Sequence, residues 1–144
     1  MDLVLTKNAK TLGRGVFLFA ILVFVDQLSK FHAVRVFYNA AFAFSLPVPV
    51  WLIYVIYFFL LLAMTAYCAK HYARFDSAQI LGWTLIFAGA FSNIGERLVL
   101  GFVRDWIYIL SGVFNLADGY IIAGIILLLT NKSSAQANTA DEQV

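Results

Sequence analysis

The chain has 144 residues, of which 62% are hydrophobic and 12% are charged, and its formal net charge is +2. A soluble domain usually carries about a quarter charged residues, so this composition excludes an ordinary water-soluble fold and indicates a membrane protein. The small net charge gives no reason to expect a nucleic-acid partner, and the single cysteine, Cys68, excludes an intrachain disulfide.

Four apolar segments follow one another along the chain, and each is near the length of about 20 residues that a membrane-spanning helix needs. They cover approximately residues 15–28, 50–69, 79–94 and 113–129. We therefore predict an all-α membrane protein with four transmembrane helices in one domain, residues 1–132. The remaining stretch, residues 133–144, is small, polar and acidic, and is predicted to be a disordered tail.

The first segment has a basic start, which is also typical of a secretory signal peptide. No small-x-small cleavage site follows its apolar core directly. The polar run Asp26-Gln27-Leu28-Ser29-Lys30 follows instead, so we predict that the segment stays attached.

Basic residues predict the orientation, because they are enriched on the cytoplasmic side of a membrane. With the N-terminus in the cytoplasm, the inner side holds Lys7, Lys10, Arg14, Lys70, Arg74 and Lys132, and the outer side holds Lys30, Arg35, Arg97 and Arg104. Four spans then return the C-terminus to the cytoplasm. The polar residues of the apolar region converge on the outer face: Asp26, Asn93, Glu96, Arg97, Asp105, Asn115 and Asp118.

The connection between the first two segments is not featureless. Val34, Val36 and Tyr38 alternate with other residues, which predicts a short strand. Pro47 and Pro49 then stop regular structure before the second helix.

Asp105 and Asp118 are the strongest candidates for chemistry. An ionisable group at the mouth of a membrane helix is costly and usually marks a functional site. Two carboxylates that meet share a proton, so that one acts as base towards water while the other hydrogen-bonds a scissile carbonyl. Such a pair needs no metal or cofactor, and the two histidines, His32 and His71, are predicted on opposite sides of the membrane. The alternative is a solvated acid at Asp105 and a first-turn helix acid at Asp118.

Three further spacings place polar residues on shared helix faces. Asp26 and Lys30 are four apart, which fits either an interfacial ion pair or substrate contact. Asn93 and Arg97 are also four apart, and Arg97 is either a solvated helix-end cation or a ligand for a peptide carbonyl or carboxylate. Asn115 precedes Asp118 by three residues, where it fits an N-cap as well as a site residue.

Five blocks in this order resemble the lipoprotein signal peptidases, also called signal peptidase II. Asp26-Gln27-Leu28-Ser29-Lys30 is similar to the family's D-Q-x-S-K, and the segment from Asn39 to Ser45 resembles its N-x-G-x-A-F-S. The segment from Gly89 to Arg97 resembles G-x-x-[GS]-N-x-x-D-R. The segments 103–106 and 114–118 resemble V-x-D-F and F-N-x-A-D.

The resemblance implies an aspartyl endopeptidase of the bacterial cytoplasmic (inner) membrane, with its active site at the extracytoplasmic face and no cofactor or metal. Its substrates would be prolipoproteins that carry diacylglycerol on a cysteine, cut just before that cysteine. Asp105 and Asp118 would be the catalytic dyad, and residues 1–132 the peptidase domain. The residues that would line or brace the site are Asp26, Lys30, Asn39, Asn93, Arg97 and Asn115. The loop around Asn39 would form a small β-like cradle, and we expect a monomer in contact with membrane lipid.

The chain departs from the family pattern at three positions. Ala41 stands where the family has Gly, Glu96 replaces Asp, and Trp106 replaces Phe. Arg104, beside the catalytic candidate, is a charge to which the sequence assigns no role. Two other functions stay open: a small proton-coupled membrane transporter, and a non-catalytic relative that binds lipoproteins.

Overall fold

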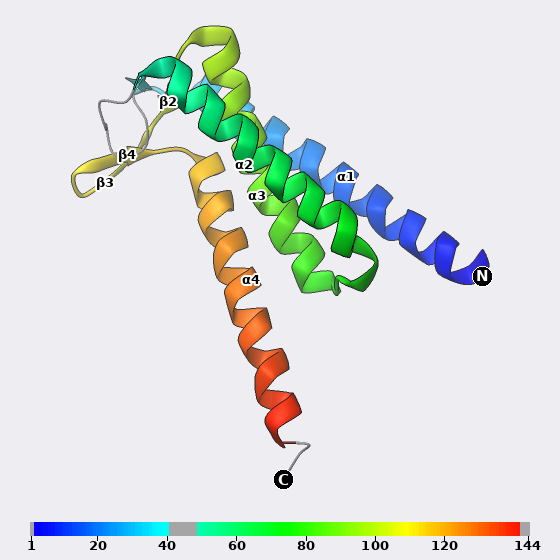
Figure 1. Ribbon diagram of the computed structural model, residues 1–144. Coiled ribbons are helices and arrows are strands. Elements are labelled where there is room, and N and C mark those ends of the chain that lie inside the picture. The colour runs from blue at the N-terminus through cyan, green and yellow to red at the C-terminus, as the bar shows by residue number, and fades with distance from the viewer. Residues whose placement is uncertain (1, 41–48, 142–144) are drawn as a thin grey trace.

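The computed structural model describes residues 2–40 and 49–141, and this part of the chain is mostly helical. The long helices are α1 (Asp2–His32), α2 (Val50–His71), α3 (Ser77–Leu100) and α4 (Leu116–Asp141), and a 3-10 turn, η2 (Tyr72–Arg74), follows α2. The strands are β1 (Phe37–Asn39), β2 (Val103–Asp105), β3 (Ile107–Ile109) and β4 (Gly112–Phe114). The strands gather at one end of the helices, and both chain termini point away from that end (Figure 1).

The distribution of side chains is the reverse of that in a soluble protein. Large apolar side chains such as Phe58, Phe59 and Leu129 are more than 60% exposed. The buried side chains include eight that are polar or charged: Asp26, Lys30, Ser92, Asn93, Glu96, Arg97, Asp105 and Asn115. An apolar exterior around a polar interior is the pattern expected of a protein that is solvated by lipid.

By length and composition, two described segments are long and apolar enough to cross a membrane, Leu12–His32 and Trp51–Arg74. The apolar part of α4, Leu116–Asn131, is shorter. The helix α3 begins with a capping box, in which Asp76 and Gln79 each accept a hydrogen bond from the other's backbone N–H. It ends at Gly101, whose φ of 81° is readily adopted only by glycine.

The structure corrects several predicted boundaries. The strand predicted at residues 34–38 lies at Phe37–Asn39. The region between α3 and α4, predicted as a loop, contains β2, β3 and β4, and the residues at 113–114 belong to β4 and not to the last helix. Strands of three residues are too short to show a reliable alternation in the sequence. The motif position Ala41 and the proline at position 47 lie outside the described residues.

The segment predicted as a tail, residues 133–144, begins within α4. The helix α4 continues to Asp141, so residues 133–141 are helical. Extending an existing helix costs far less than nucleating one, which explains why a polar sequence can continue it. The division of the chain into a membrane domain and a separate tail stays a prediction.

The helices α3 and α4 approach closely because glycines lie at their contact. A Cβ atom added at Gly82 would lie 2.9 Å from Leu128, and one added at Gly124 would lie 2.6 Å from the Gly82 carbonyl. A Cβ atom at Gly89 would collide with the backbone carbonyl of Ala117, in the first turn of α4. Small residues serve this purpose in membrane helices, where backbones must approach one another.

We predict that Gly89→Ala destabilises the protein by about 1–3 kcal/mol, the usual range for overpacking a close contact. The backbone that would be displaced is that of Ala117, which directly precedes the candidate residue Asp118, so activity should fall as well. Gly95→Ala is the matched control, since nothing lies within 4 Å of a Cβ atom there. The thermal unfolding midpoint of each variant is measured in detergent. Equal midpoints for Gly89→Ala and Gly95→Ala would contradict the predicted collision.

Candidate active site

Asp105 is the last residue of β2, a strand that pairs with β1 and is followed by the β3–β4 hairpin. The strand β2 pairs antiparallel with β1, so that Phe37 lies opposite Asp105 and Asn39 lies opposite Val103. The next residue, Trp106, donates its backbone N–H to the Phe114 carbonyl at 2.8 Å, which ties β2 to the β3–β4 hairpin. The position of Asp105 therefore depends on backbone pairing on both sides and not on a free loop.

Asp118 is fixed by the start of α4. Its backbone N–H donates to Asn115 Oδ1 at 3.0 Å, and its Oδ2 accepts from the Asn115 backbone N–H at 3.1 Å. This reciprocal arrangement is that of a capping box, with Asn115 in the N-cap position before Leu116. The N-cap role considered for Asn115 is thus present, and the same residue also reaches the other carboxylate.

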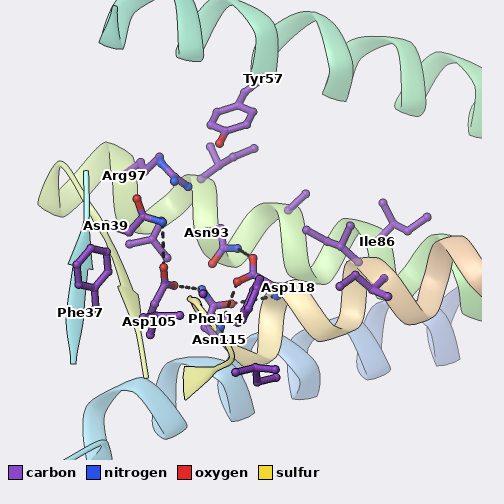
Figure 2. Close-up of a pocket in the computed structure, with 18 of the residues that line it drawn as sticks. Phe37, Asn39, Tyr57, Ile86, Asn93, Arg97, Asp105, Phe114, Asn115 and Asp118 are labelled. Atoms are coloured by element: carbon purple, nitrogen blue, oxygen red, sulfur yellow. Dashed lines mark hydrogen bonds between the residues drawn. The ribbon is translucent and has the colours of Figure 1, made fainter. Parts of the chain in front are cut away.

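Asn115 joins the two candidate carboxylates. Its Nδ2 donates to Asp105 Oδ1 at 2.6 Å, while its backbone donates to Asp118. Asn39 Nδ2 donates to Asp105 Oδ2 at 3.0 Å, and Asn93 Nδ2 donates to Asp118 Oδ1 at 2.8 Å. Each of the four carboxylate oxygens therefore accepts one N–H, and all of these donors are neutral amides (Figure 2).

The environment of Asp105 favours retention of its proton. The residue is 2% exposed, and burial raises the pKa of its carboxyl group above the ordinary value. Hydrogen bonds from Asn39 and Asn115 act in the opposite direction and lower this pKa, because they stabilise the charged form. Each carboxylate oxygen has a second lone pair, so the amide contacts leave positions for a water molecule or a shared proton.

Asp26 and Lys30 lie behind the carboxylates and are buried, so the ion pair is not an interfacial one. Lys30 Nζ contacts Asp26 Oδ2 at 2.8 Å, Glu96 Oε2 at 2.9 Å and Asn93 Oδ1 at 2.9 Å. An ammonium group only donates, so it fixes the Asn93 amide with Oδ1 towards Lys30 and Nδ2 towards Asp118. Asp26 in turn accepts from Ala117 N at 2.9 Å, which ties α1 to the first turn of α4.

A cavity of about 970 Å³ adjoins the carboxylates. Its polar part is lined by Asn39, Asn93, Arg97, Asp105, Asn115 and Asp118, whereas Asp26 and Lys30 do not line it. Its apolar part is lined by α2 (Leu60, Leu61 and Met64), α3 (Ile86 and Ala90) and α4 (Ile121 and Ile122). The cavity thus joins a polar end to an apolar channel between helices.

Two tyrosines of α2 also lie at the site, which the sequence patterns did not predict. Tyr57 lines the cavity and points towards Arg97, whose Cζ lies 5.7 Å from the centre of the Tyr57 ring (Figure 2). Tyr54 donates its hydroxyl to the Arg97 carbonyl at 2.8 Å. Arg97 is therefore a buried cation at the cavity wall and not a solvated helix end. A signal in the sequence was the spacing of these tyrosines, three apart in the apolar first half of α2.

Among the residues that the structure describes, no three His, Cys, Asp or Glu side chains are grouped so that they could hold a metal ion.

The fold is that of known bacterial membrane enzymes. Two such structures, solved by the in meso method at 2.3 Å and 1.9 Å resolution, match with TM-scores of 0.73 and 0.66. The first is 18% identical, and the match covers 88% of this chain and 91% of that one. For the second the identity is 19%, with 83% and 92% covered.

Residues 18–133 match the family model described as signal peptidase (SPase) II, and the chain belongs to this family. The resemblance drawn from the five sequence blocks is thereby confirmed. The lipoprotein signal peptidase of Streptococcus agalactiae serotype Ia is 35% identical over 95 residues, which cover 64% of this chain and 60% of that protein. The one from Fusobacterium nucleatum is 27% identical over 136 residues, covering 79% and 82%. The chain thus spans less than two thirds of the length of the streptococcal relative and most of the fusobacterial one.

Proposed function

We propose that this protein is an intramembrane aspartyl endopeptidase that removes the signal peptide from diacylglyceryl-modified prolipoproteins, just before the lipidated cysteine. The observation that carries the proposal is that Asn115 forms hydrogen bonds with both Asp105 and Asp118, at the polar end of a cavity whose other end is apolar. Membership of the signal peptidase II family supports the same reaction.

Asp105 and Asp118 act as a coupled pair that shares one proton. The ionised carboxylate takes a proton from water, whose oxygen then attacks the scissile carbonyl carbon. The protonated carboxyl group hydrogen-bonds the carbonyl oxygen, and a proton is passed to the amide nitrogen as the C–N bond breaks. The reaction consumes one water and releases a carboxylate and an ammonium group, so the dyad returns to its starting protonation.

The remaining site residues have separate tasks. Asn39, Asn93 and Asn115 hold the carboxylates by direct hydrogen bonds, and Asp26 and Lys30 brace them from behind. Arg97, at the cavity wall, suits a peptide carbonyl of the substrate.

The apolar channel suits the hydrophobic parts of such a substrate. Its walls from α2, α3 and α4 would receive the signal-peptide helix or acyl chains, while the scissile bond lies at the polar end. Burial of apolar surface contributes roughly 25 cal/mol per Å², so a lipid chain adds substantial binding energy.

The test uses purified protein with matched precursors that differ only in the diacylglyceryl group. We expect cleavage of the modified precursor just before its cysteine and little cleavage of the unmodified one. Equal rates on the two would reject the lipid-dependent part of the proposal, and no cleavage of either would reject the peptidase.

We further propose that α1 to α4 all cross the bacterial inner membrane, with both termini in the cytoplasm and the strands at the extracytoplasmic face. The loop around Asn39 would then form the cradle for the substrate. The apolar exterior and the position of the strands at one end support this arrangement (Figure 1).

The predicted topology is tested with two kinds of reporter, one that is active only in the cytoplasm and one that is active only outside. Fused after Lys132, the cytoplasmic reporter should be active. Fused in the connection after Val34, the outside reporter should be active. Activity of both fusions on the same side would contradict the four-span arrangement.

A further inference from the structure

Arg104 adjoins Asp105 on β2, and its side chain is engaged away from the cavity. Its Nε lies 2.6 Å from Glu96 Oε1, and its backbone N–H donates to Glu96 Oε2 at 3.1 Å. Its Nη2 donates to Gln27 Oε1 at 3.0 Å. A single carboxylate of α3 therefore holds residue 104 by both main chain and side chain, while α1 supplies the third contact.

These contacts form one path from the neighbour of Asp105 to Asp118. Glu96 Oε2 also lies 2.9 Å from Lys30 Nζ, and Lys30 donates to Asn93 Oδ1 at 2.9 Å. Asn93 then donates to Asp118 at 2.8 Å. The relative position of the two candidate carboxylates is thus set by a continuous series of polar contacts through α3 and α1.

The charges in this cluster balance. Asp26 and Glu96 are paired with Lys30 and Arg104, and the Lys30, Asp26 and Glu96 side chains are almost fully buried. Removal of Arg104 would leave two carboxylates competing for the Lys30 ammonium group, which also has to orient Asn93. Buried charges without full pairing are costly, so the cluster would rearrange.

We propose that Arg104 is a positioning residue for the Asp105–Asp118 pair. It clamps β2 onto α3 and α1 through Glu96 and Gln27, and it does so without lining the cavity. The role rests on the proposed peptidase function. It also offers a reason for Glu at position 96, where the family pattern has Asp, because this carboxylate has to reach both Lys30 and Arg104.

A clamp of this kind affects the reaction step more than substrate binding. We expect Arg104→Gln to lower kcat about tenfold, as the loss of one charge-assisted hydrogen bond would, with KM changed by less than about twofold. Arg104→Lys keeps the positive charge that faces Glu96 but loses the contact with Gln27, so its kcat should lie between those of the wild type and Arg104→Gln. In Glu96→Gln, the further change Arg104→Gln should have little additional effect, because the two residues act as one unit.

The experiment measures kcat and KM on the diacylglyceryl-modified precursor, together with the thermal unfolding midpoint of each variant in detergent. Arg35→Gln is the matched control, because Arg35 is an exposed arginine near the same end of the helices. Wild-type kcat in folded Arg104→Gln, or a raised KM at unchanged kcat, would overturn the positioning role while leaving the peptidase function intact.

If Arg104→Gln does not fold, Arg104→Lys decides: a reduced kcat at unchanged KM supports the role, and a wild-type kcat overturns it. A wild-type protein that cleaves no precursor would overturn the proposed function and this role with it.

Discussion

Asp105→Asn and Asp118→Asn are each expected to abolish measurable cleavage of the lipid-modified precursor. An amide keeps the shape of the carboxyl group but cannot exchange a proton, and general acid–base catalysis is typically worth about 10²–10⁴-fold. Because both groups serve one proton-transfer unit, the double variant should be little worse than either single one. Substantial cleavage by either folded single variant would end the aspartyl mechanism.

The two variants should differ in stability. Asp105→Asn places an NH₂ group against the side-chain amide of Asn39 or Asn115, both of which lie on the wall of the cavity. Asp118→Asn places its NH₂ group against either the Asn115 backbone N–H or Asn93 Nδ2, and the Asn93 amide is fixed because the buried Lys30 ammonium group holds its oxygen. We therefore expect the lower unfolding midpoint for Asp118→Asn. Equal midpoints would show that these amides are not fixed as the hydrogen bonds require.

The wild-type rate should be bell-shaped in pH. As the pH falls, the second carboxylate becomes protonated and no base remains, so the rate falls. As the pH rises, the shared proton is lost and no acid remains, so the rate falls again. Burial raises the pKa of Asp105, which moves the alkaline limb above the ordinary range for an aspartate. A rate that rises monotonically over this range would contradict a shared proton.

Lys30→Met should be the most destabilising single substitution in the cluster. The ammonium group is fully buried and contacts Asp26, Glu96 and Asn93, so its removal leaves the buried Asp26 carboxylate without its ion-pair partner and Glu96 with Arg104 alone. Removal of one partner from a buried ion pair typically costs about 3–5 kcal/mol. Activity should fall too, because the Asn93 amide loses the contact that orients it towards Asp118.

The measurement is chemical or thermal unfolding in detergent, with Lys70→Met as the matched control. Lys70 is exposed at the far end of α2, so its replacement should change the unfolding free energy by less than about 0.5 kcal/mol. Equal stability of the two variants would show that the Lys30 contacts contribute nothing to the folded state.

Sequence patterns were sufficient for the helices and for the set of polar residues that meet. Long apolar segments mark helices strongly, and the carboxylates at positions 105 and 118 stood out because charge is expensive in lipid. The strands β2, β3 and β4 were not predicted, and the pairing of β2 with β1 is part of what positions Asp105. The role of Arg104 was also not predictable, because its contacts reach Glu96 and Gln27 on two different helices. Contacts between residues so far apart in sequence, such as Ala117 N with Asp26, follow from helix packing and leave no periodic signal.

The helix α2 contacts α3 near Tyr54 and lines the cavity further along, and for the lipid-anchored substrate proposed above this has a kinetic consequence. Ile53 is buried and Tyr54 is bonded to the Arg97 carbonyl, but further along α2 the side chains of Leu60, Leu61 and Met64 face the cavity. In the proposed reaction, a precursor that enters between α2 and α4 would travel by diffusion in two dimensions within the bilayer. Its encounter rate then scales with its mole fraction in the membrane, so diluting the protein and precursor in additional lipid should slow cleavage even when bulk concentrations stay constant.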